Sequence, residues 1–232
     1  MKQEQEPYAG TGILEHLAEA VNYNAYLVSL IKSRLSGTEQ VIDFGAGIGT
    51  FAEPLAESCQ KLICVEPDAE QAMRLASLGL TYFHDLGPIA DDSQDLVYSL
   101  NVLEHIEDDA AVFSALCDRL KPGGTLLIYV PAFMVLYSTF DAEIGHVRRY
   151  RLEQLTRLAE TNNLRIEEGR YVDSLGFLAA LAFKLLRLNS GGVGQASVRI
   201  YDSLIFPASL WLDKIVGKFF GKNVLLIAHK KA

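Results

Sequence analysis

The chain has 232 residues, half of them hydrophobic and 22% charged, a composition typical of a folded domain and not of a disordered segment. Its formal net charge of −8 argues against a general nucleic-acid binder, because such proteins carry a basic face. The three cysteines have no spacing typical of a disulfide framework or a zinc site, so we expect buried thiols and no bound metal.

The predicted elements begin after a polar, acidic N-terminus without a signal-peptide pattern, which favours a cytoplasmic protein. Apolar residues recur three or four positions apart from Ile13 to Leu35 and predict a helix in an N-terminal cap over residues 1–38. Strand–helix alternation then indicates a parallel, doubly wound sheet within one domain over residues 1–232. The short apolar runs predict strands at Gln40–Phe44, Leu62–Val65, Leu80–Phe83, Leu96–Leu100, Thr125–Val130, Arg165–Val172 and Asn223–Lys230.

A long insert, residues 173–222, separates the last two predicted strands, and it exceeds an ordinary hairpin loop. It contains two apolar stretches, Leu175–Leu188 and Ile200–Phe220, on either side of a glycine- and serine-rich break at Ser190–Gly194. We expect two helices that pack over the sheet edge. The second mixes aromatic residues with lysines, so a peripheral membrane contact, a cover for an oily acceptor and a core or homodimer interface remain open.

The first predicted strand runs into a glycine-rich turn, Asp43-Phe44-Gly45-Ala46-Gly47-Ile48-Gly49, and then into a helix that starts near Phe51. Glycines let the backbone bend tightly and let a ligand lie against the main chain. A dinucleotide turn has the pattern G-x-G-x-x-G, but here the third glycine comes one residue early. The Asp43 carboxylate would repel a pyrophosphate and suits a ligand with an ammonium group. The turn therefore favours a cationic amino-acid ligand.

Other polar residues follow the next predicted strands at their carboxyl ends, the edge where open α/β sheets bind ligands. Glu66 lies about twenty residues after the glycines, where an acidic side chain can accept both ribose hydroxyls. Asp85 ends the following strand and is placed to accept from an adenine amino group. Glu104 and His105 open a helix after the fourth strand, where capping and packing are at least as expected as catalysis.

Together these segments resemble the class I S-adenosylmethionine-dependent methyltransferases from the first helix to the last strand. D-F-G-A-G-I-G-T is similar to the first motif of that family, V-E-P-D to its ribose-binding loop, N-V-L-E-H-I to its fourth-strand motif, and L-K-P-G-G-T-L-L-I to the turn before its fifth strand. The resemblance implies a seven-stranded, mostly parallel sheet with an antiparallel last strand. The family usually joins the last two strands by a simple hairpin, from which the helical insert departs.

The resemblance also implies S-adenosylmethionine as the cofactor and places its contacts. The methionine part would lie against Asp43, Gly45, Gly47 and Gly49; the ribose on Glu66; the adenine on Asp85 and Leu86; and the sulfonium beside Asn101. The activity implied is methyl transfer to a small-molecule acceptor. A nicotinamide-dependent oxidoreductase, and a cofactor-binding scaffold without turnover, remain as alternatives.

The acceptor is expected near residues 140–151, which concentrate histidine, arginine, tyrosine and carboxylates after the fifth strand. His146 is placed to act as a general base for a hydroxyl acceptor. Arg148 and Arg149 suit a phosphate or carboxylate on the acceptor, or they pair with neighbouring acids.

The segment G-H-V-R-R-Y, together with Asn22-Tyr23-Asn24 and Gly221-Lys222-Asn223-Val224, is similar to a bacterial methyltransferase subgroup. Its members are often met beside glycosyltransferases of cell-surface glycan pathways. This resemblance implies O-methylation of a sugar-like or lipid-linked acceptor, with substrate contacts at Tyr23, Asp141, Arg148 and Tyr150.

Overall fold

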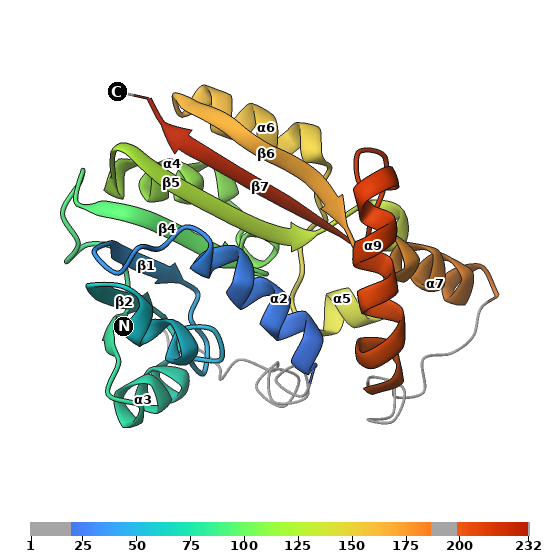
Figure 1. Cartoon of the computed structure of the whole chain (residues 1–232), viewed down its shortest axis with the longest axis horizontal. Helices are drawn as coiled ribbons and strands as arrows, with labels where there is room; N and C mark the ends of the chain where they lie inside the picture. Colours follow the sequence, from blue (N-terminus) through green and yellow to red (C-terminus); the bar gives the residue numbers. More distant parts are fainter. Residues whose placement is uncertain (1–19, 187–198, 232) are drawn as a thin grey trace, which may run out of the picture.

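A seven-stranded sheet forms the centre of the computed structural model, which describes residues 20–186 and 199–231. The strands run in the order β3-β2-β1-β4-β5-β7-β6 (Figure 1). The pairs among β1 to β5 are parallel, whereas β7 is antiparallel to both β5 and β6. The predicted mostly parallel sheet with an antiparallel last strand is confirmed. The strands are β1 (Gln40–Phe44), β2 (Lys61–Val65), β3 (Thr81–Phe83), β4 (Gln94–Leu100), β5 (Leu120–Pro131), β6 (Leu164–Val172) and β7 (Asn223–Lys230).

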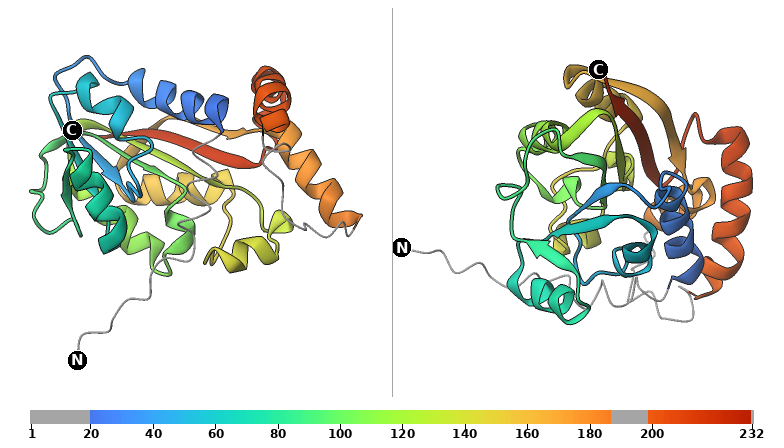
Figure 2. Two further views of the ribbon diagram at one scale, coloured as in Figure 1. Left: turned by 90° about the horizontal axis from the view of Figure 1, so that it is seen from below. Right: turned by 60° about the vertical axis from the view of Figure 1, so that its left-hand side comes forward.

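Helices cover both faces of the sheet (Figure 2). Successive side chains of a strand point to opposite faces, so Val41 and Ile42 of β1 enter two different cores. The core of Val41 contains residues from α2 (Val21–Lys32), the short helix η1 (Glu53–Ser58) and α3 (Ala69–Ser77); that of Ile42 contains residues from α4 (Asp109–Arg119) and α6 (Leu152–Thr161). Two filled layers hold the strand ends in place.

Several element boundaries differ from the prediction by a few residues, and two helical segments differ in kind. The element after the glycine turn is the 3₁₀ helix η1 instead of an α-helix, and Pro54 lies in its first turn, where its ring removes a backbone donor. Leu103–His105 forms a separate 3₁₀ turn, η2, before α4 begins. Of the predicted N-terminal helix, residues 13–19 lie outside the described residues.

The segment between β6 and β7 contains α7 (Ser174–Leu185), the π-helical turn η4 (Tyr201–Ile205) and α9 (Phe206–Val216). Figure 1 shows α9 across the carboxyl ends of β5 and β6, beside the amino end of α2. The predicted break at Ser190–Gly194 lies outside the described residues. Within the described ranges, no helix combines the length and the apolarity needed to cross a membrane. The insert therefore lies at the end of the sheet where the cofactor residues were predicted.

Two buried aspartates join this insert to the rest of the fold. Asp202 accepts hydrogen bonds from the backbone nitrogens of Asn22 and Tyr23 at 2.8 and 2.9 Å, and so caps the amino end of α2. Asp213 accepts from the backbone nitrogens of Asp173 and Ser174 at 2.7 and 2.9 Å, and so caps the entry to α7. The N-terminal helix and the insert are thus fixed to each other across the end of the sheet.

The turn between α5 (Thr139–Glu143) and α6 completes this end of the molecule. After β5 the chain forms η3 (Met134–Leu136) and then α5. The turn after α5 returns to the sheet at Tyr150, which forms an isolated bridge with Ala132.

Candidate active site

The glycine turn has a backbone that only glycine adopts easily. Gly45, Gly47 and Gly49 have φ angles of 79°, 55° and 89°. A Cβ atom on Gly45 would lie 2.3 Å from a methyl carbon of Val102, so the bare backbone lets the turn approach the end of β4. A Cβ atom on Gly49 would instead lie 2.9 Å from Leu78 beyond α3. Gly45 and Gly49 thus both allow close packing, and contact of the three glycines with the cofactor stays a prediction.

Asp43 is an ionisable group that the fold leaves without a full set of partners. Its side chain is 3% exposed, and its Oδ2 atom has no hydrogen-bond partner among the described residues. Burial raises the pKa of Asp43 to about 7; the hydroxyl of Tyr98 opposes this rise, and the charge of Glu66 adds to it. A buried carboxylate is costly without a compensating donor or positive charge, which the ammonium group of an amino-acid ligand would provide.

Glu66, at the end of β2, connects directly to the glycine turn. Its carboxylate accepts hydrogen bonds from the backbone nitrogens of Gly47 at 2.8 Å and Asp68 at 3.0 Å. Burial raises its pKa, although these two backbone bonds lower it. Each carboxylate oxygen can accept more than one bond, so hydroxyls of a ribose can still be received here. The predicted methionine-binding and ribose-binding motifs thus meet in space.

Asp85 and Leu86, the residues predicted to hold adenine, follow the end of β3. Asp85 is exposed, and its Oδ1 atom accepts from the backbone nitrogen of Gly87 at 2.7 Å. Leu86 is half-buried and packs against the core that contains Ile42. His84 turns back toward Glu66, with its Nδ1 atom 3.2 Å from the Glu66 carbonyl oxygen. These contacts place the residues predicted for adenine next to the one predicted for ribose.

Asn101, after β4, brings the N-terminal helix into the site. Its backbone has φ 55°, and its amide nitrogen donates to the Tyr23 hydroxyl at 3.4 Å. The Tyr23 ring packs edge-on against Tyr129 of β5 and Phe206 of α9, with ring centroids 6.1 and 5.4 Å apart. Burial raises the pKa of Tyr23, and the Glu104 carboxylate contributes to the rise. The sequence alone placed Tyr23 only by resemblance; the fold places it beside Asn101.

His146 is held by a buried carboxylate. Its Nδ1 atom lies 2.8 Å from Asp141 Oδ1, and Asp141 is fully buried at the start of α5. Arg149 also pairs with Asp141, at 2.8 Å through Nε and 3.1 Å through Nη2. Burial opposes ionisation of Asp141, but the hydrogen bonds from His146 and Arg149 hold its pKa below the usual range. Of the two alternatives for Arg149, the structure shows pairing with a neighbouring acid.

Arg148 and Tyr150 converge on Asp109 at the start of α4. Arg148 Nη1 lies 2.6 Å from one Asp109 oxygen, and the Tyr150 hydroxyl donates to the other at 2.7 Å. Tyr150 is 2% exposed. Both side chains therefore tie the loop to α4, and this geometry gives Tyr150 a positioning role instead of contact with an acceptor.

Sequence reasoning gave too little weight to the pair Glu104 and His105. Glu104 is fully buried, and within the described parts of the chain neither of its carboxylate oxygens has a hydrogen-bond partner. Its Oε1 atom lies 3.7 Å from His146 Nε2, and the His105 ring packs edge-on against His146 at 4.6 Å. Burial raises the pKa of Glu104 to about 8 and lowers that of His105 to about 4. The Glu104 carboxylate thus faces His146 in the interior, where the sequence suggested a helix cap.

Comparison with known sequences agrees with this site. Residues 13–168 match the family described as "Methyltransferase domain". A probable S-adenosylmethionine-dependent methyltransferase of Mycolicibacterium smegmatis is 26% identical over 197 residues, which are 80% of this chain and 74% of that protein. A trans-aconitate 2-methyltransferase of Deinococcus radiodurans is 31% identical over 126 residues, and a ubiquinone biosynthesis O-methyltransferase of Xanthomonas campestris is 30% identical over 99. These alignments span 48% and 41% of the two proteins' own lengths.

Solved structures share the fold. A methyltransferase from Archaeoglobus fulgidus superposes with a TM-score of 0.64 at 20% identity, over 91% of this chain and 94% of that one. A phosphoethanolamine N-methyltransferase from Haemonchus contortus, solved with S-adenosylmethionine, gives 0.60 at 21% identity, over 91% and 53%. Nothing in these comparisons supports the nicotinamide-dependent alternative. The chain belongs to the methyltransferase-domain family, and it is a class I enzyme that uses S-adenosylmethionine as its cofactor.

Proposed function

We propose that the enzyme transfers a methyl group to a hydroxyl oxygen of a small-molecule acceptor, and that this acceptor is sugar-like or lipid-linked. The observation that carries the proposal is the Asp141–His146 pair, because a buried carboxylate on Nδ1 orients the imidazole and leaves Nε2 available. The neighbouring group Asn101–Tyr23 supports the same location for the reaction. A hydroxyl must lose its proton during transfer, and His146 Nε2 is the group placed to receive it.

On this proposal the cofactor is held by side chains from three strand ends. Bound S-adenosylmethionine supplies a methyl group that its sulfonium charge already activates. Asp43 receives the ammonium group and Glu66 the ribose hydroxyls, while Asn101 and Tyr23 line the space beside the methyl group. Asp85, Leu86, Gly45 and Gly47 complete the cofactor site. Alignment in a site closed to water is most of what this reaction requires of a protein.

Relatives support a small-molecule acceptor. The name of the Deinococcus protein gives trans-aconitate, a small molecule, as its acceptor. The name of the Xanthomonas protein gives O-methylation in ubiquinone biosynthesis. The narrower choice of a sugar-like or lipid-linked acceptor rests on the similarity of the G-H-V-R-R-Y segment to the glycan-associated subgroup.

The variant His146→Ala tests the assignment of the base. Because His146 contacts acceptor and not cofactor in this proposal, affinity for S-adenosylmethionine stays within about twofold, while turnover falls roughly 10²–10⁴-fold. Calorimetry measures the affinity, and transfer of a radiolabelled methyl group into aqueous and lipid extracts of the source cells measures turnover. A large loss of cofactor affinity would move His146 into the cofactor pocket. Transfer into no fraction by the wild-type protein, with normal cofactor binding, would favour the scaffold alternative.

We also propose that α7 and α9 rest on a membrane surface or on the lipid part of the acceptor. Large apolar side chains are exposed along both helices, among them Phe183 at 59% and Leu185 at 73% on α7 and Trp211 at 66% on α9. Trp211 is the single tryptophan of the chain, so its fluorescence reports on this surface directly. We expect a blue shift of the Trp211 emission when anionic phospholipid vesicles are added; the Trp211→Phe variant lacks this emission and supplies the background of the vesicles and tyrosines. A shift that depends on protein concentration without vesicles would identify a homodimer interface instead.

A further inference from the structure

The cluster formed by Glu104, His105 and His146 lies outside the groups needed to bind the cofactor. One ligand atom from each residue lies within 4.8 Å of the others. Glu104 and His105 come from η2 after β4, and His146 comes from the loop before α6, about forty residues later in the chain. The topology therefore brings two histidines and a carboxylate to one point at the carboxyl end of the sheet.

We propose that Glu104, His105 and His146 bind a divalent transition-metal ion, with zinc as the best fit, and that the ion contacts the acceptor oxygen. Two histidines and one glutamate are the protein ligands of many catalytic zinc sites, which keep a further position open. Ligand atoms about 2.1 Å from zinc lie roughly 3.4 Å from one another in a tetrahedral site. The separation of 3.7 Å between Glu104 and His146 is close to that spacing, and the ligand atoms of all three residues lie within 4.8 Å of one another.

The surroundings of the cluster are those of a prepared ligand set. Asp141 accepts from Nδ1 of His146, which leaves Nε2 facing Glu104. Metal-bound histidines almost always donate their other ring nitrogen to a carboxylate or a carbonyl in this way. His105 is likewise held by hydrogen bonds to the backbone of Ile144 and Gly145. Both rings are therefore fixed from behind.

Charge balance also favours a cation. The Arg149 guanidinium forms two hydrogen bonds with Asp141, so those two charges largely cancel. Glu104 remains as a fully buried carboxylate, and no hydrogen-bond donor reaches its oxygens in the described segments. Ionising a buried carboxyl group is costly, and a divalent ion beside Glu104 would compensate the charge of its carboxylate. The His146 side chain is 10% exposed, so one side of the cluster reaches solvent and an open metal position can meet an acceptor.

The site gives the ion a specific task, which rests on the proposed transfer to a hydroxyl. Glu104 follows Asn101 by three residues, and Asn101 donates to the Tyr23 hydroxyl, so the cluster lies close in the chain to the residues proposed to line the space beside the methyl group. A metal-bound hydroxyl has a lowered pKa. Its proton passes to solvent water, and the negatively charged oxygen stays on the ion. With the ion bound, His146 Nε2 is a ligand and the ion takes over the task of making the acceptor hydroxyl acidic; without the ion, His146 Nε2 receives the proton as proposed above.

Zinc titration of protein stripped with a chelator tests the site. We expect one zinc per chain in the wild type, and at least a tenfold loss of affinity in Glu104→Gln and in His146→Ala. Glu104→Gln keeps the shape of the side chain, so it stays informative if His146→Ala loosens the loop; circular dichroism checks both. Cobalt binding should give visible absorption bands in the wild type that Glu104→Gln abolishes.

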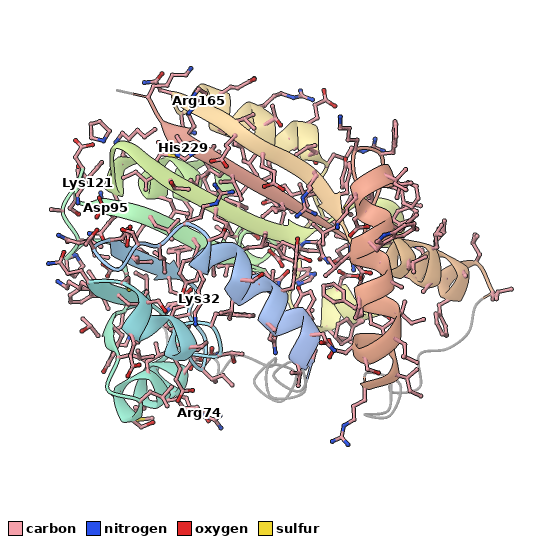
Figure 3. All side chains as sticks on the ribbon, in the orientation of Figure 1. Lys32, Arg74, Asp95, Lys121, Arg165 and His229 are labelled. Carbon is pink, nitrogen blue, oxygen red and sulfur yellow. The ribbon has the colours of Figure 1, made fainter. Side chains whose placement is uncertain are left out.

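The matched control is His229→Ala. Figure 3 shows His229 toward the end of β7 that lies away from α9, and His229 pairs with Thr125 at the start of the parallel part of β5. This variant should bind zinc as the wild type does. No saturable zinc uptake by folded wild-type protein, or equal affinity in the wild type and both cluster variants, would overturn the site. Titration of S-adenosylmethionine into the same samples is independent: cofactor binding without zinc refutes only the metal site, and zinc without cofactor refutes only the proposed function.

Discussion

Replacing Asp43 with asparagine should stabilise the unliganded protein and lower its affinity for the cofactor. The Asp43 side chain is 3% exposed, and burial raises its pKa from an ordinary 3.8 to about 7. Because the folded-state pKa is raised, the folded protein binds the proton more tightly than the unfolded chain. The free energy of unfolding should therefore be highest below pH 4, decrease as the pH rises from 4 to 7, and stay constant above pH 7 as far as Asp43 is concerned.

The size of the effect follows from the pKa difference. One pKa unit corresponds to about 1.4 kcal/mol. Relative to low pH, the raised pKa of Asp43 therefore lowers the free energy of unfolding of the empty protein by about 4 kcal/mol at pH 8 and by about 2 kcal/mol at pH 5.5. The Asp43→Asn side chain does not titrate. The difference in free energy of unfolding, variant minus wild type, should therefore be about 2 kcal/mol larger at pH 8 than at pH 5.5. Urea unfolding at the two pH values measures this change.

Cofactor binding should move in the opposite direction. The variant lacks the carboxylate that receives the ammonium group, so calorimetry at pH 8 should show at least a tenfold weaker Kd, or about 1.4 kcal/mol. The exposed Asp118 provides a matched control, since Asp118→Asn should alter neither property. A stability difference between wild type and Asp43→Asn that is the same at both pH values would refute the assignment of the buried, titrating carboxyl.

Three further substitutions test other parts of the structure. Gly45→Ala places a Cβ atom 2.3 Å from Val102, so we expect a loss of about 1–3 kcal/mol in thermal unfolding together with weaker cofactor binding. Glu66→Ala should raise the Kd for S-adenosylmethionine at least tenfold, because it removes the proposed ribose contact and the acceptor of the Gly47 and Asp68 backbone hydrogen bonds; an unchanged Kd would contradict its role. Asp202→Ala removes the cap on α2 and should cost about 1–2 kcal/mol in urea unfolding, and an unchanged midpoint would show that the cap is not needed.

Local patterns in the sequence were enough to predict the sheet and the cofactor cradle. The strands and the glycine turn are read from neighbouring residues, and the acidic residues at strand ends meet because parallel strands end at one edge. Glu66 was predicted to bind ribose at a strand end; the structure shows its carboxylate 2.8 Å from the Gly47 backbone nitrogen, and the ribose contact stays a prediction. The helix after the turn was wrong in type because Pro54 favours the tighter 3₁₀ form.

Tertiary structure decided what lies around that cradle. Asp202 caps a helix 180 residues earlier in the chain, and Asp109 receives both Arg148 and Tyr150 from some forty residues away. Glu104 looked like a capping residue, yet the fold buries it opposite His146. Such contacts depend on how layers pack and which polar groups are left to pair once the core is closed. Periodic patterns in the sequence do not predict these contacts, because the partners are far apart in the chain and close only in space.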